Sequence, residues 1–170
     1  MRTWAGAGMI ALAVLAAPAS PALAQSPVGR AVTAVGVSFL RSGDATALGF
    51  MVDTAKNFAV GESVGIGPVG DFGFYRHEDF TITSFFGGGR VTIGRGPVQV
   101  FGQTLVGYER CCGVSDFAWQ PGGGLDIRVN AMLNIRSQMD LRIIRPGDGD
   151  GAQTFRDLRL SFGVSMPFGK

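Results

Sequence analysis

The segment from Leu133 to Arg145 alternates between apolar and polar residues at nearly every position. One face would carry Leu133, Ile135, Ser137, Met139, Leu141 and Ile143, and the other Asn134, Arg136, Gln138, Asp140 and Arg142. A period of two residues indicates a β-strand with one apolar and one charged face. Residues 158–168 repeat the pattern. Both segments reach the roughly 9–11 residues that a membrane-spanning strand needs, whereas strands of soluble proteins are commonly about 5–6 residues long.

The N-terminal segment has the features of an export signal. Arg2 precedes an uncharged apolar run at residues 5–17, and Ala22-Leu23-Ala24 forms a small-x-small cleavage site before Gln25. The run is too short for a retained anchor helix, and no Cys marks a lipoprotein. We therefore predict a signal peptide at residues 1–24 and one exported domain at residues 25–170.

Composition favours a closed barrel. No other apolar run approaches the roughly 18 residues of a transmembrane helix, so a membrane-embedded domain would have to be a barrel. Glycine is abundant, with 27 residues, and Lys56 and Lys170 are the only lysines among 15 basic residues. Arg and Asp suit a hydrogen-bonded interior, while a soluble sheet usually exposes Lys and Glu. The net charge of +2 and the absence of a basic patch argue against nucleic acid as a partner.

The pattern predicts an all-β domain, an eight-stranded antiparallel up-and-down transmembrane β-barrel. The strands are expected at residues 31–40, 47–56, 58–67, 80–93, 98–110, 118–130, 132–145 and 154–168. Short turns at residues 56–57, 94–97 and 130–131 would alternate with longer loops at residues 41–46, 68–79, 111–117 and 146–153. Such alternation is typical of outer-membrane barrels, whose short turns are periplasmic.

Several stretches carry a family resemblance to small bacterial outer-membrane β-barrel proteins. They are residues 84–90, Ser-Phe-Phe-Gly-Gly-Gly-Arg, residues 101–107, residues 118–126 with Gln120-Pro121-Gly122-Gly123-Gly124, followed by Arg136 and Asp140, and the closing strand that ends Met166-Pro167-Phe168-Gly169. The porin-like barrels related in architecture to the OmpA membrane domain are the nearest type. The resemblance implies a barrel in the outer membrane of a Gram-negative bacterium, with the lipid bilayer and the barrel-assembly machinery as partners. It implies no activity, no catalytic residue and no cofactor.

One departure from that family is at the C-terminus. Many such barrels end in an aromatic residue that resembles an assembly signal, whereas here Phe168 is followed by Gly169 and Lys170.

The charged face of the last three strands is the main candidate site. It carries Asp126, Arg128, Arg136, Asp140, Arg142 and Arg159. These residues could line a channel or form an ion-pair network that fills the barrel. Eight strands enclose little more than side chains, so we favour the filled interior. Paired charges there would also hold strand register, because a lone buried charge is costly.

Two further motifs could carry chemistry. Cys111 and Cys112 are adjacent and could form a strained vicinal disulfide with a redox or metal-sensitive role, an intermolecular disulfide, or two incidental thiols. His77-Glu78-Asp79, with Ser84 nearby, could bind a divalent ion or act as a general base, but a solvated polar loop is the simpler interpretation. We predict no enzyme activity, no metal site and no cofactor. Tyr108, Phe117, Trp119 and Phe168 fit interfacial aromatic girdles.

These features predict a small outer-membrane barrel with a structural or surface-interaction role. The rival interpretation is a secreted or periplasmic ligand-binding barrel of the lipocalin or streptavidin type. That barrel would have its apolar face inward, and alternation alone does not say which face points in.

Overall fold

The computed structural model describes residues 30–145 and 154–168, so the predicted signal peptide lies outside the described residues. The strands are β1 Ala31–Ser42, β2 Ala45–Lys56, β3 Phe58–Ala59, β4 Val64–Arg76, β5 Thr81–Ile93, β6 Val98–Cys111, β7 Val114–Arg128, β8 Asn134–Arg145 and β9 Phe155–Phe168. No helix in this part of the chain is long and apolar enough to cross a bilayer.

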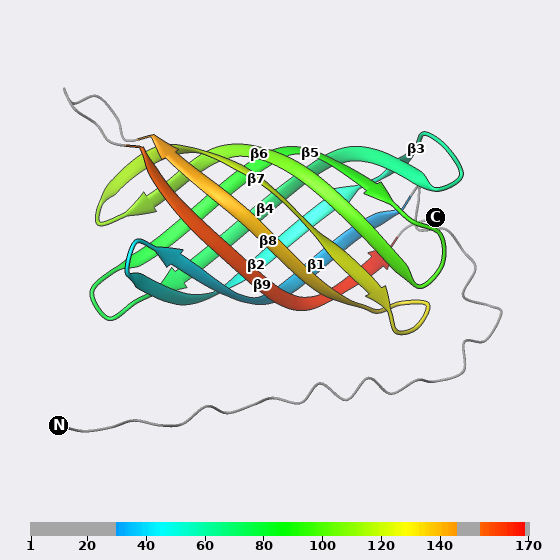
Figure 1. Ribbon diagram of the computed structural model, residues 1–170, viewed down its shortest axis with the longest axis horizontal. Helices are drawn as coiled ribbons and strands as arrows, with labels where there is room; N and C mark the ends of the chain where they lie inside the picture. The colour runs from blue at the N-terminus through cyan, green and yellow to red at the C-terminus, as the bar shows by residue number, and fades with distance from the viewer. Residues whose placement is uncertain (1–29, 146–153, 169–170) are drawn as a thin grey trace, which may run out of the picture.

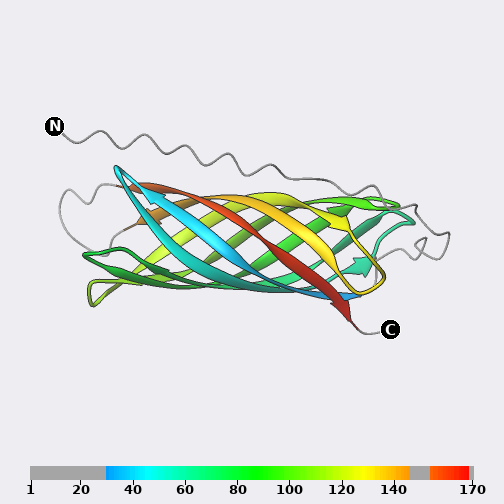
Figure 2. The same cartoon turned by 90° about the horizontal axis from the view of Figure 1, so that it is seen from below.

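Eight of these strands close into an antiparallel barrel (Figures 1 and 2). Each long strand pairs with the next one along the chain, and β1 pairs with β9 from Ala31–Phe168 to Ser42–Asp157, which closes the barrel. The two-residue β3 only extends the pairing of β4. The predicted eight-stranded up-and-down barrel is confirmed. Closure leaves no exposed sheet edge, which is the condition for strands to enter a bilayer.

The two ends of the barrel differ in their connections. We call the end that carries Ala31 and Phe168 the terminal end, and the opposite end the hairpin end. The described connections at the hairpin end are short: residues 43–44, 77–80 and 112–113. Those at the terminal end are residues 57–63, 94–97 and 129–133; the second is as long as 77–80, and the other two are longer. The predicted short turn at residues 94–97 is found, but the predicted loops at 41–46, 68–79 and 111–117 are short and the predicted turns at 56–57 and 130–131 are longer. The predicted loop at residues 146–153 lies outside the described residues.

The third barrel strand is also displaced from its predicted position. We expected residues 58–67, followed by a loop at residues 68–79, but β4 runs from Val64 to Arg76. Pro68 and several glycines gave this segment the composition of a loop. In the barrel Pro68 is exposed and pairs with Gly89, and Gly73 leaves space beside the Tyr75 and Ser84 hydroxyl groups inside. Proline and glycine are thus accommodated within a strand here.

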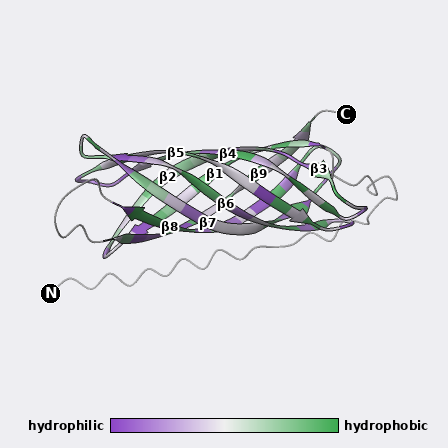
Figure 3. Cartoon of the chain, turned by 90° about the horizontal axis from the view of Figure 1, so that it is seen from above, coloured by the Kyte–Doolittle hydropathy of each residue, from purple (hydrophilic) through white to green (hydrophobic). Residues whose placement is uncertain are grey.

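Hydropathy alternates along the strands (Figure 3), and side-chain burial places the apolar residues on the exterior and the polar residues in the interior. Ile135, Met139 and Leu141 of β8 are exposed, while Arg136 and Asp140 between them are buried. The same division holds on β9, where Phe162 is 54% exposed. This is the orientation expected for a membrane barrel, and the rival arrangement with the apolar face inward is wrong.

Candidate functional site

Four arginines dominate the barrel interior. Arg90 of β5, Arg136 and Arg142 of β8, and Arg159 of β9 are all at most 2% exposed. They face buried acidic residues contributed by five strands: Asp53, Asp71, Glu109, Asp126 and Asp140. We call these nine charged residues the interior network. Because a buried charge is tolerated only when it is paired and hydrogen-bonded, the geometry of the pairs decides what the interior can do.

Asp53 joins two of the arginines. Its carboxylate accepts hydrogen bonds from Arg90 Nη2 at 2.6 Å and from Arg136 Nη1 at 2.7 Å. Arg136 also donates from Nε and Nη2 to the two oxygens of Asp126, at 2.8 and 2.6 Å. One side of the Arg136 fork thus meets the neighbouring strand and the other reaches across the barrel, a geometry that suits the planar guanidinium.

Asp140 is a second junction. It accepts hydrogen bonds from Arg159 Nε at 2.8 Å, from Gln103 Nε2 at 3.0 Å and from Gln138 Nε2 at 2.9 Å. Arg159 also donates from both terminal nitrogens to Asp71, each at 2.8 Å. The hydrogen bonds of Asp140 therefore connect three strands, β6, β8 and β9, and its side chain is fully buried.

Arg142 extends these contacts toward the hairpin end. It donates to Gln120 Oε1 at 2.9 Å, to Glu109 Oε2 at 2.7 Å, and to the hydroxyl oxygens of Tyr75 and Ser84, each at 2.9 Å. The Tyr75 hydroxyl also accepts a hydrogen bond from Arg159 at 3.3 Å. Polar contacts thus run without a break through the middle of the interior.

The inner face of β6 mixes polar and apolar side chains, which makes its orientation difficult to predict from sequence. Gln99, Gln103 and Glu109 share the interior with Phe101 and Leu105. The Phe101 ring contacts two guanidinium groups, with its centroid 4.3 Å from Arg90 Cζ and 4.6 Å from Arg136 Cζ. An aromatic face attracts cations, so an apolar ring belongs in this charged interior.

The structure brings together five of the six predicted site residues. Asp126, Arg136, Asp140, Arg142 and Arg159 belong to the interior network. Arg128 is half-buried near the terminal end, where it pairs in register with Asn134.

Sequence reasoning missed the other four members of the network. These are Asp53, Asp71, Arg90 and Glu109. A single charge within an otherwise apolar or glycine-rich strand is the sequence signal that could have indicated these interior residues. It is clearest at Asp53 and Arg90.

The Gln-Pro-Gly-Gly-Gly motif of β7 makes room for these groups. A Cβ atom on Gly122 would collide with the Asp140 carboxylate, and one on Gly124 would lie 2.8 Å from Phe101 Cζ and against the Ser137 carbonyl. Pro121, which has no N–H, lies where the register between β7 and β8 is interrupted. Gly122 and Gly124 of the motif therefore leave the space that the Asp140 carboxylate and the Phe101 ring occupy.

We expect Gly124→Val to destabilise the barrel by about 1–3 kcal/mol, because the added atoms overpack the interior. Gly102→Val is the matched control, since a Cβ there meets nothing within 4 Å. Urea unfolding of both variants in the same detergent measures the difference. Equal midpoints would show that the interior beside Gly124 adapts freely.

The two cysteines lie at the hairpin end, between β6 and β7. Cys111 is half-buried and Cys112 is exposed; both are free, with their Sγ atoms 3.0 Å apart. Cys112 has φ of 55°, and Gly113 has φ of 85°, so both central residues of the turn are left-handed. This conformation is typical of tight hairpins but uncommon for cysteine.

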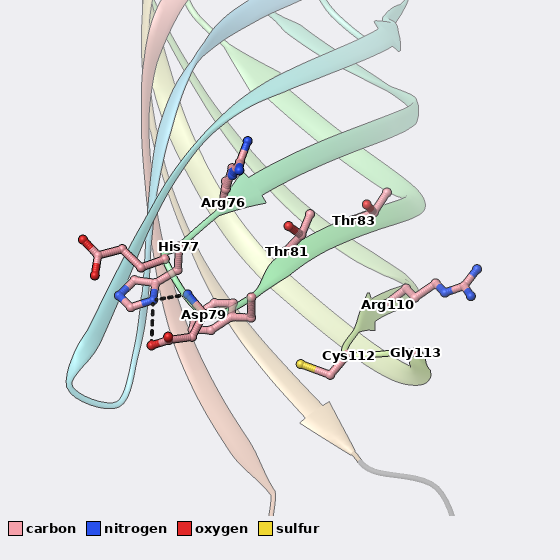
Figure 4. A pocket seen from close by; sticks show the side chains of 10 residues that line it. Arg76, His77, Asp79, Thr81, Thr83, Arg110, Cys112 and Gly113 are labelled. Carbon is pink, nitrogen blue, oxygen red and sulfur yellow. Dashed lines mark hydrogen bonds and ion pairs between the residues drawn. The ribbon is translucent and has the colours of Figure 1, made fainter.

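His77 belongs to the short β4–β5 connection and lines a surface hollow of about 490 Å³ at the hairpin end (Figure 4). Its ring stacks on Phe80 at 4.8 Å, and its Nδ1 lies 3.8 Å from Asp79 Oδ2. Ser84 instead lies buried in the interior, beside Arg142. The structure thus separates the histidine from the serine. Among residues 30–145 and 154–168, no cluster of three or more acidic, histidine or cysteine residues could hold a metal ion.

The predicted girdle aromatics are on the outer face. Tyr108, Phe117, Trp119 and Phe168 are 45–62% exposed. Tyr108 and Phe117 pack edge to face at 5.9 Å, and the Trp119 indole N–H donates to Thr104 Oγ1 at 2.7 Å. Phe168 marks the terminal end and the others lie toward the hairpin end.

Comparisons with known proteins support the fold. The chain matches Neisserial surface protein A, NspA, with a TM-score of 0.59 and 16% identity over 82% of this chain and 97% of that one. Ail, the attachment invasion locus protein of Yersinia pestis, has a TM-score of 0.57 and 14% identity over 83% and 99% of the two chains. The outer membrane enzyme PagL has a TM-score of 0.51 and 11% identity over 81% and 99%. No protein-family model and no curated protein sequence matches the chain. The fold is therefore shared with small outer-membrane barrels.

Proposed function

We propose that the chain is a small integral outer-membrane barrel with a closed interior and a structural or surface-interaction role. The observation that carries this proposal is the polarity of the two faces: large apolar side chains cover the exterior, and arginine and acidic side chains fill the interior. In water such a barrel would expose its apolar face, and only a bilayer makes that face favourable.

The connections suggest how the barrel crosses the membrane. An exported chain reaches the outer membrane from the periplasm. The described hairpin-end connections are only two to four residues long, and these can cross a bilayer at a lower desolvation cost than both chain termini. The terminal end then faces the periplasm and the hairpin end faces the exterior.

The interior supports a closed barrel rather than a pore. Eight strands leave space only for side chains, and here the arginine side chains reach across it. Toward the hairpin end the interior is apolar, formed by Leu40, Ala47, Tyr75 and Ile82 with Phe80 and Cys111 packed against them. A hydrated ion would have to displace both layers.

A non-enzymatic role fits the separation of His77 from Ser84 and the use of the buried acids in ion pairs. Because the same barrel type includes NspA, Ail and the enzyme PagL, the fold alone does not decide this. The disposition of the polar groups favours a structural or surface role.

Refolding of residues 25–170 into phosphatidylcholine vesicles tests both parts of the proposal. We expect the protein to float with the vesicles after alkaline carbonate washing, and planar-bilayer recordings to show no stable conductance. Protein that stays in the wash would disprove membrane insertion. Large reproducible conductance steps from inserted protein would disprove the closed interior alone.

A further inference from the structure

The outer surface at the hairpin end carries a ring of arginines. On every barrel strand, the outward position closest to that end is polar: Arg41, Thr46, Arg76, Thr81, Arg110, Ser115, Arg145 and Arg156. All eight are exposed. We call the five arginines among them the arginine ring.

The ring lies directly beside the apolar side chains that cover the outer face of the barrel, which we call the apolar belt. Two residues closer to the barrel centre, the outward positions include Phe39, Phe74, Tyr108, Phe117 and Leu158. Two residues of an antiparallel strand span about 6.8 Å. Aromatic side chains favour the boundary between acyl chains and headgroups, so the ring is at headgroup height when the belt is in the bilayer.

Among the described residues, the terminal end has one cation at the corresponding outward positions, the half-buried Lys56 of β2, against five at the hairpin end. Its outermost outward positions include Ile93, Val98, Ile127, Ile135 and Phe168. The five arginines therefore distinguish the rim of the hairpin end from that of the terminal end.

In the described part of the chain, none of the salt bridges contains an arginine of the ring. Arg41 makes one long hydrogen bond, from Nε to the Gly43 carbonyl at 3.4 Å. The acids Asp44, Glu78 and Asp79 lie in the turns beyond the strands, and Asp79 is beside His77.

The hollow shown in Figure 4 lies between two members of the ring. Arg76 of β4 and Arg110 of β6 flank β5, which contributes Thr81 and Thr83 to the lining. Two guanidinium groups and two hydroxyl groups of the lining can donate to a phosphate, and the turn acids Glu78 and Asp79 also line the hollow.

We propose that the arginine ring binds the phosphate groups of lipid headgroups in the leaflet that surrounds the hairpin end. The proposal rests on the membrane insertion proposed above. Guanidinium groups bind phosphate oxygens with paired hydrogen bonds, and each basic side chain near a membrane surface contributes an attraction of about fivefold in affinity. The ring would select phosphate-rich lipid and fix the height of the barrel in the bilayer.

Trp119 provides the probe, because it is the only tryptophan in residues 25–170 and lies on the outer face of β7. Arg110 and Arg145 belong to the strands on either side of β7. The protein is refolded into phosphatidylcholine vesicles in which either phosphatidylcholine or phosphatidic acid carries brominated chains, and quenching of Trp119 gives the relative affinity of the two lipids.

We expect the wild type to prefer phosphatidic acid by roughly fivefold or more, and R110Q/R145Q to lower the ratio to near one. R110K/R145K should keep most of the preference. The matched control R30Q/R95Q removes two charges at the terminal end and should keep it fully. No preference in the wild type, an unchanged ratio in R110Q/R145Q, or an equal loss in R30Q/R95Q would each overturn the proposal.

The same measurement separates the two proposals. If brominated phosphatidylcholine itself fails to quench Trp119, the barrel is not in the bilayer and the proposed function fails. If it quenches Trp119 but phosphatidic acid shows no advantage, only the role of the arginine ring fails.

Discussion

Asp140→Ala should lower the free energy of unfolding by about 3–5 kcal/mol, the range for removing one partner of a buried ion pair. Asp140 is fully buried and accepts hydrogen bonds from Arg159, Gln103 and Gln138. The substitution leaves Arg159 with Asp71 as its remaining carboxylate partner and leaves two amide groups without their acceptor. Unfolding in urea, followed by circular dichroism in one detergent, measures the effect.

Asp44→Ala is the internal control for this change, since Asp44 is exposed in the β1–β2 turn. We expect its effect to stay within about 0.5 kcal/mol, as for most surface substitutions. Asp140→Asn retains the shape of the side chain and loses its charge, so it should fall between the two. Equal and small effects of the two alanine substitutions would mean that water reaches Asp140, and the closed interior would have to be abandoned.

Phe162→Arg should destabilise the inserted barrel by about 2–4 kcal/mol, because it places a charge on the lipid face near mid-bilayer. Phe162 is exposed at the middle of β9, in register with Val37 on β1 and Ser137 on β8. Leu141→Arg on β8 tests the same face closer to the hairpin end and should have a smaller effect. The fraction refolded into phosphatidylcholine vesicles, read from protease protection, measures the loss.

Thr154→Arg adds the same charge just before β9, outside the strand, and should insert like the wild type. Because both variants add the same charge, comparing Phe162→Arg with Thr154→Arg tests the effect of the depth of that charge in the bilayer. If Phe162→Arg inserts as well as Thr154→Arg and the protein is soluble without detergent, the exterior does not face lipid.

Strands β7, β8 and β9 could be predicted from sequence because their alternation is clean and one face is charged. Register and orientation then follow from a single rule, that side chains alternate across a strand. β4 was misplaced because Gly67, Pro68, Gly70 and Gly73 are local signals of a loop, while the pairing that makes them a strand is made with β2 and β5. Turn composition is a local property and barrel closure is not.

The same difference between local and long-range contacts explains which members of the interior network could be predicted from the sequence. Arg136 and Asp126 are close in sequence and lie on neighbouring strands, so both were predicted. Asp53 and Asp71 meet Arg136 and Arg159 only across the closed barrel, at sequence separations of 83 and 88 residues. No periodic pattern in one strand indicates a partner at that distance. The Phe101 ring was similarly ambiguous, because its two arginine contacts come from β5 and β8.

These long-range ion pairs also bear on how the barrel assembles. Asp53 and Asp71 belong to the N-terminal strands, and their partners Arg136 and Arg159 belong to the last two. In a curved sheet that had not yet closed, Arg136 and Arg159 would keep only the carboxylates of the neighbouring strands, Asp126 and Asp140. Asp53 and Asp71 would then lack these arginines, and hydrocarbon would not solvate the unpaired groups. Closure and entry into the bilayer core are therefore coupled, and a half-inserted sheet is a high-energy state. The charge pairs would make assembly an all-or-none step in which the first and last strands must meet before the chain is committed to the membrane.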